Sequence, residues 1–168
     1  MNGKADFIAN FWEAVKEFQY RYPGMHKVLA VCDADDEPAN ELEAFLTRRA
    51  EEKLQSLPFP LMFHVIKREL ETWWVAEPHS ITLETGVEIP FPGGNVEEDL
   101  VDPKEYLSRR LGARNITYTR RIASKAAENL NLATISARCP GFVVFAQKVE
   151  DGEGMARASG RPLRRIVL

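Results

Sequence analysis

The sequence has few cysteines and no long apolar run, and both absences exclude whole classes of protein. Only two cysteines, Cys32 and Cys139, occur among its 168 residues. They are too few for a disulfide framework or a cysteine-based zinc site, so we expect two buried free thiols. The longest apolar runs, such as residues 28–32 and 61–63, are too short to span a bilayer, so we expect no membrane-spanning segment.

An excess of positive charge is also missing. The chain carries 22 basic and 25 acidic side chains, which gives a net charge of −3. This balance provides no overall electrostatic signature of nucleic-acid binding, although it leaves a local site open. The N-terminus lacks the apolar segment of a signal peptide, and we therefore expect a cytoplasmic protein.

Several common catalytic motifs are absent as well. The three histidines, His26, His64 and His79, do not have the spacing of zinc ligands. The sequence contains neither a nucleophile elbow nor a glycine-rich phosphate loop followed by lysine and serine or threonine. The chemistry is therefore to be sought among the carboxylates.

The pattern that the sequence does contain is that of an α/β domain. Residues 28–32 are a continuous apolar run, which is typical of a strand buried on both faces, and residues 61–66, interrupted by His64, predict a second buried strand. Between them, residues 38–56 carry apolar side chains at helical spacing. Strand, helix and strand in this order predict a parallel sheet flanked by helices. An amphipathic helix over residues 7–18 precedes this unit.

Composition divides the chain into three parts. Residues 1–83 form the predicted α/β core, residues 84–150 a loop plus a helical C-terminal appendage, and residues 151–168 a mobile tail. Prolines, glycines and acidic residues predict that 84–101 is an exposed loop. The appendage is expected to contain helices that begin at Asp102 or cover residues 118–130 and 141–149.

Only two strands are convincing, and a two-stranded parallel sheet is not a stable core by itself. We therefore expect a further strand, which the tail, another chain or a segment missing from the N-terminus would supply. An uncovered sheet edge offers unpaired backbone groups, and the apolar stripe of the opening helix needs cover, so we expect a homodimer.

Acidic residues follow both predicted strands. Asp33 and Asp35 come directly after the first strand, and Glu69 and Glu71 follow the second. Because neighbouring parallel strands end at one edge of the sheet, these four carboxylates are expected to lie close together. Mg²⁺ prefers one or two carboxylates and keeps waters for a substrate phosphate. The pattern favours Asp33 and Asp35 as metal ligands.

A structural explanation of these acids is equally open. Asp33, Asp35 and Asp36 also suit the cap of the following helix. Glu69 and Glu71 suit the start of a helix, where the dipole favours negative charge.

The neighbouring side chains have the same two interpretations. Lys67 and Arg68 suit a bound phosphate, but ion pairs with nearby acids explain them as well. Trp73 and Trp74 fit core positions better than a platform for stacking bases.

These residues resemble a known family. The sequence VLAVCDAD at 28–35 resembles the Asp-x-Asp strand of topoisomerase-primase (TOPRIM) domains. RELETWWVAEPHSI at 68–81 is similar to a signature of the prokaryotic TOPRIM-like family called domain of unknown function 4276. DPKEYL at 102–107 and ARCPGF at 137–142 resemble later elements, with Gly141 where serine is usual. The match covers residues 27–149.

The resemblance implies a TOPRIM-like fold and a nuclease or phosphotransferase that depends on Mg²⁺ or Mn²⁺. Asp33 and Asp35 would bind the metal, and Glu69 and Glu71 match an acidic element of the family. It further implies a nucleic-acid substrate and an ATPase partner in a prokaryotic defence system.

The chain departs from the family in one respect. TOPRIM domains begin with a strand that ends in a catalytic glutamate, and residues 1–27 contain no such strand. The alternative function is therefore a non-catalytic interaction module that keeps the fold.

Overall fold

The computed structural model describes residues 3–158 and divides into two compact units. Of these residues, the first unit comprises 3–32, 37–65 and 144–158, and the second comprises 33–36 and 66–143. The units therefore interleave along the chain, whereas the predicted boundary at residue 83 was placed on composition. No helix in the described part is long and apolar enough to cross a membrane.

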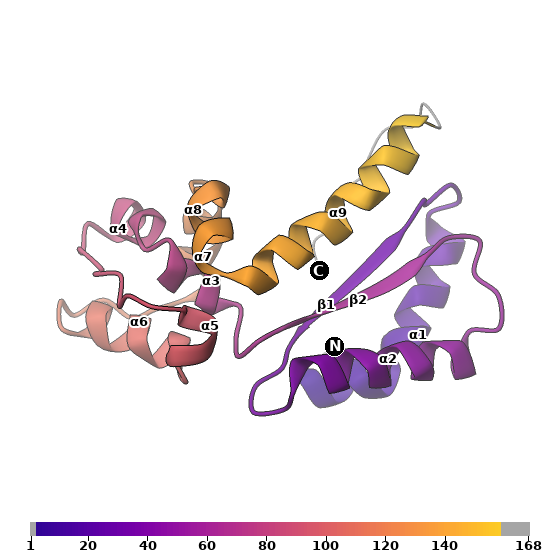
Figure 1. Ribbon diagram of the computed structural model, residues 1–168, viewed down its shortest axis with the longest axis horizontal. Helices are drawn as coiled ribbons and strands as arrows, with labels where there is room; N and C mark the ends of the chain where they lie inside the picture. Colours follow the sequence, from indigo (N-terminus) through magenta and orange to yellow (C-terminus); the bar gives the residue numbers. More distant parts are fainter. Residues whose placement is uncertain (1–2, 159–168) are drawn as a thin grey trace. The chain divides into compact units, whose positions relative to one another are not determined.

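The first unit is built around a small sheet. Its helices and strands are α1 (Lys4–Arg21), β1 (Val28–Asp33), α2 (Ala39–Lys53), β2 (Leu61–Ile66) and most of α9 (Pro140–Ala158). The second unit is helical, with α3 (Glu71–Ala76), α4 (His79–Thr85), α5 (Val96–Asp99), α6 (Pro103–Gly112), α7 (Arg120–Ala127) and α8 (Leu132–Arg138). Figure 1 shows the elements in the order of the sequence.

The two strands are parallel neighbours, as the sequence predicts. At one end the N–H of Val28 donates to the carbonyl of Pro60 over 2.9 Å, and at the other the N–H of Ala34 donates to Ile66 over 2.8 Å. The sequence separation between donor and acceptor is the same in both bonds, which occurs only in a parallel pair.

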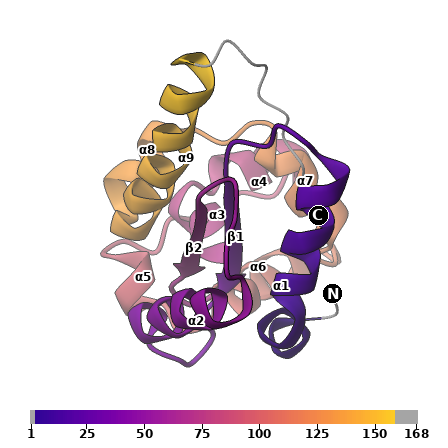
Figure 2. The same cartoon turned by 90° about the vertical axis from the view of Figure 1, so that its right-hand side faces the viewer.

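Helices cover both faces of this sheet. Phe63 and His64 are adjacent in β2 and therefore point to opposite faces. The Phe63 ring meets Phe11 of α1 edge to face, with ring centroids 5.1 Å apart, whereas His64 lies 5.3 Å from Phe145 of α9. Figures 1 and 2 show α1 and α2 on one side of the strands and α9 on the other. The mixed α/β class is confirmed.

In the second unit α3 is the central helix. Trp73, Trp74, Val75 and Ala76 are all buried. Trp73 packs edge to face against Phe142, with ring centroids 4.9 Å apart. The interpretation of the two tryptophans as core residues is therefore the one that the structure favours.

Three local predictions need correction. The segment 84–101 is not a uniformly exposed loop, because it contains α5, where Val96 and Glu97 are buried and the side chain of Asn95 accepts the N–H of Glu97 as a helix cap. The helix predicted over 118–130 is shorter, and α8 follows it. Likewise, α9 continues to Ala158, past the predicted start of a mobile tail at residue 151. Residues 159–168 of that tail lie outside the described part.

Candidate functional site

The four predicted carboxylates come from two turns that lie together in the second unit. Asp33 is the last residue of β1, and Asp35 lies in the turn that follows. Glu69 lies in the turn after β2, and Glu71 is the first residue of α3. Both strand ends therefore deliver acids into the same unit, as parallel pairing predicts.

The backbone that carries them is held in an unusual conformation. Asp35 and Arg68 both have positive φ, 52° and 67°, in the left-handed region that L-residues seldom occupy. The N–H of Asp35 donates to the carbonyl of Arg68 over 3.0 Å and thus joins the two turns. Such conformations cost roughly 1–3 kcal/mol each and persist only where the surroundings enforce them.

Asp33 lies in an environment that disfavours its charge. Its carboxyl is half-buried, and burial, together with the negative charges of Glu71, Asp35 and Glu69, raises its pKa to about 6. A hydrogen bond from the backbone of Leu70 opposes the rise only in part. The charged form is therefore unfavourable at neutral pH unless a cation or another donor neutralises it.

Tyr118 is a neighbour of the acidic residues that the sequence did not predict. Burial and the nearby carboxylate of Glu71 raise the pKa of its hydroxyl. The hydroxyl lies near Glu71, and among the described residues it is buried without a well-formed hydrogen bond. Tyr118 lies just before α7, and no local motif marks it, so only the tertiary fold brings it to Glu71.

Glu69 has a structural role in addition to its place in the cluster. One carboxylate oxygen accepts the backbone N–H of Lys104, in the first turn of α6, over 3.1 Å. Asp102, which the sequence marks as the cap of that helix, makes no capping hydrogen bond with its side chain. The carboxylate of Glu69, which comes from a distant turn, thus caps the N-terminus of α6 in place of Asp102.

The capping explanation of the aspartates is not supported at α2. The residue before that helix is Pro38, and no side chain caps its N-terminus. Glu71, by contrast, does lie in the first turn of α3, as the helix-start explanation predicts.

The two basic residues differ in their contacts. The Nζ of Lys67 forms an ion pair with Glu98, so this lysine is explained by an ion pair without a bound phosphate. The Nε of Arg68 is buried and has no hydrogen-bond partner among the described residues. Of the two, only Arg68 thus has a buried donor available for an anion.

The chemical type of the side-chain donors determines which cations the acidic cluster suits. No group of three or more histidine, cysteine or acidic side chains among the described residues has the geometry of a metal site. Carboxylate oxygens are nevertheless the ligands of hard cations, and Mg²⁺ needs only one or two with water completing its shell. Asp33 and Asp35 carry the type of oxygen donor that a partly hydrated Mg²⁺ or Mn²⁺ ion requires.

The second unit holds another buried carboxylate. Glu97 is 6% exposed, and burial raises its pKa. Its two oxygens accept the N–H of Gly141, at the start of α9, over 3.1 and 3.0 Å. A Cβ at Gly141 would lie 2.6 Å from one of these oxygens, so glycine fits where the resemblance leads one to expect serine.

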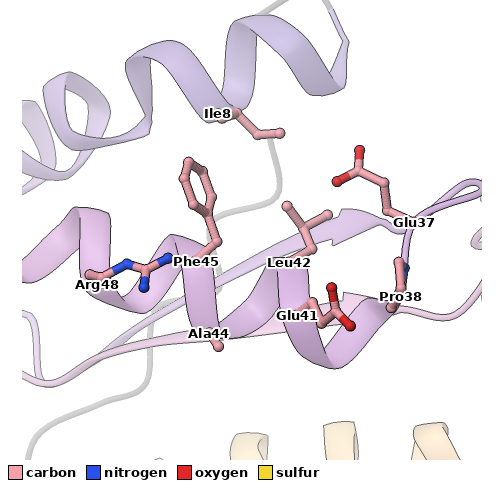
Figure 3. Close-up of a pocket in the computed structure, with 8 residues that line it drawn as sticks. All are labelled: Ile8, Glu37, Pro38, Glu41, Leu42, Ala44, Phe45 and Arg48. Carbon is pink, nitrogen blue, oxygen red and sulfur yellow. The ribbon is translucent and has the colours of Figure 1, made fainter.

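The first unit has an open groove of a different kind. Figure 3 shows it between α1 and α2, with Ile8, Leu42 and Phe45 between the two helices. Glu37 and Glu41 lie toward one end and Arg48 toward the other. None of the predicted site residues lines it.

No protein-family model, curated protein or solved structure gives a significant match to this chain. The resemblance to TOPRIM domains therefore depends on the residues quoted above.

Proposed function

We propose that the acidic cluster of Asp33, Asp35, Glu69 and Glu71 is a TOPRIM-like site that binds Mg²⁺ or Mn²⁺ and acts on a phosphodiester of nucleic acid. One observation carries the proposal: the hydrogen bond from Asp35 to Arg68 joins two acidic turns whose backbone is left-handed at both residues. Strained, enforced backbone of this kind clusters at binding and catalytic sites. The charge repulsion around Asp33 supports the proposal, because a cation would relieve it.

Each residue has a role that its surroundings suit. Asp33 and Asp35 would hold the cation, which when bound would polarise the phosphate and lower the pKa of water. Glu71 accepts the proton of the attacking water while that oxygen bonds to phosphorus and the P–O bond to the leaving group breaks. The buried Nε of Arg68 would donate to the phosphate, and Lys67 could do so only after its ion pair with Glu98 breaks.

Calorimetric titration with Mn²⁺ tests the metal site. The Asp33→Asn/Asp35→Asn variant should bind Mn²⁺ at least about tenfold more weakly than the parent. Asp102→Asn/Glu88→Gln is the matched control, because it removes two exposed carboxylates and the same amount of charge. Equal weakening in both variants, or in neither, would contradict the site.

A second function is favoured by one observation. A carboxylate oxygen of Glu69 accepts the backbone N–H of Lys104 at the start of α6, so this side chain already has a structural role. That role suits a non-catalytic module that interacts with an ATPase partner. Incubation of DNA and of RNA with the protein and Mn²⁺ separates the two functions: cleavage that Asp33→Asn/Asp35→Asn abolishes supports the nuclease, and binding of Mn²⁺ without cleavage supports the module.

A further inference from the structure

The two edges of the sheet in the first unit are not equivalent. In β2 the odd-numbered residues direct their N–H and C=O groups away from β1, because Ile66 points its carbonyl toward β1. On that outer edge the N–H of Val65 donates to the carboxylate of Glu43 over 3.3 Å, and the carbonyl of Phe63 accepts the Nζ of Lys148 over 2.7 Å. Side chains thus close the outer edge of β2.

The outer edge of β1 is open. Val28 and Ala34 point their N–H groups toward β2, so the odd-numbered residues Leu29 and Val31 direct theirs outward. The sheet of the described residues has no third strand, and no described side chain bonds to these groups. Val31 is 39% exposed. The edge also lacks the lysine or proline that commonly protects an exposed strand.

We infer that β1 pairs with β1 of a second copy of this chain, antiparallel about a two-fold axis, to give a continuous four-stranded sheet. The inference goes beyond the proposed function and does not depend on it. Pairing would satisfy the outward groups of Leu29 and Val31 in both copies and bury the exposed Val31 side chain.

The charges at the ends of the strand favour this orientation. Lys27 precedes β1, whereas Asp33 and Asp35 lie at its other end. An antiparallel pair places the basic start of each strand opposite the acidic end of its partner, and a parallel pair would place acids beside acids. A symmetric pair also ends assembly at two copies, because the outer edge of β2 is closed by Glu43 and Lys148.

Sedimentation of the full chain tests the dimer without metal. The parent should have about twice the 19.1 kDa mass of one chain at tens of micromolar. Val31→Pro should be a monomer, because proline removes an outward N–H without touching the bonds to β2. Val31→Thr keeps that N–H and should remain a dimer. A monomeric parent, or a Val31→Pro variant that stays dimeric, would overturn the inference.

Amide hydrogen exchange of the unmodified chain gives a test that no folding defect can disturb. The N–H groups of Leu29 and Val31 should be protected about tenfold or more at high protein concentration and lose that protection on dilution. Those of Ala30 and Cys32 face β2 and should be protected at both concentrations. Protection of Leu29 and Val31 that is independent of concentration, or absent throughout, would exclude pairing at this edge, and a dimer with such exchange would use another surface.

Discussion

The two units differ in the charge state of a buried or half-buried titratable group at neutral pH. In the first unit His64 is 4% exposed, and burial and the positive charge of Lys148 lower its pKa to about 4. In the second, burial and three neighbouring carboxylates raise the pKa of Asp33 to about 6. At neutral pH the histidine is thus uncharged and costs the fold little, whereas the aspartate is charged and costs it free energy.

This difference separates a structural polar group from a candidate binding group. Beside His64 in the first unit, the charge of Lys148 is matched, since its Nζ forms an ion pair with Glu43 and donates to the carbonyl of Phe63. The second unit keeps at Asp33 a charge that the described residues neutralise only through one backbone donor. Proteins retain such an unfavourable charge where a ligand neutralises it or where function requires it. Three predictions test the contrast.

The largest effect is expected at His64. Its pKa in the folded protein, about 4, lies below its value of 6.5 in the unfolded chain, so the unfolded chain takes up the proton first. The stability present above pH 6.5 is therefore lost as the pH falls toward 4, by up to about 3 kcal/mol. Urea unfolding at a series of pH values should show that His64→Leu removes this loss. His79→Leu, at an exposed histidine, should keep it. Identical pH profiles of the parent and His64→Leu would contradict the assignment.

The next effect concerns the satisfied carboxylate of the second unit. Gly141→Ala would place a Cβ against the Glu97 carboxylate and should lower the free energy of unfolding by about 1–3 kcal/mol. Gly112→Ala is the matched control, because a Cβ there meets nothing within 4 Å. Thermal unfolding measures both. Adding Glu97→Ala should make the cost of Gly141→Ala much smaller, and a cost that is unchanged in that background would show that the carboxylate is not its cause.

The smallest effect is expected at Asp33 and has the opposite sign from that at His64. Its folded pKa of about 6 exceeds the unfolded value of 3.8, so stability is lost as the pH rises through this window. Asp33→Asn should therefore raise the free energy of unfolding at pH 7.5 by about 1–2 kcal/mol, after allowance for solvent screening of a half-exposed group.

The gain at Asp33 should shrink to a small fraction near pH 4, where the carboxyl is protonated in the folded protein and about half protonated in the unfolded chain. Asp36→Asn removes an exposed neighbouring charge and should not reproduce the pH dependence. Urea unfolding at pH 4 and 7.5 checks both variants. A destabilising Asp33→Asn at neutral pH would mean that the carboxylate is already neutralised within the fold.

The local elements were predictable where one pattern dominates. The apolar run 28–32 and the mostly apolar segment 61–66 form β1 and β2, and the parallel pairing followed from the helix between them. The helical spacing of residues 38–56 likewise became α2. These predictions succeeded because a buried strand and an amphipathic helix each have their own periodicity.

Contacts between distant segments were not predictable. Glu69 caps α6 although a local aspartate stands at its start, Tyr118 approaches Glu71, and Gly141 leaves room for Glu97. The helix α5 was missed because one buried valine and an asparagine cap are a weak signal among prolines, glycines and acids.

The sequence by itself determined that acids would end two neighbouring strands, because strand parity and chain order are local properties. Only the tertiary structure decided which of those acids is buried, which caps a helix and which edge of the sheet is closed. Burial, charge repulsion and the bonding of an outward N–H depend on groups far away in the sequence. At Asp33 the decisive neighbour is Glu71, and at the edge of β2 it is Lys148, whose position in α9 no strand pattern encodes.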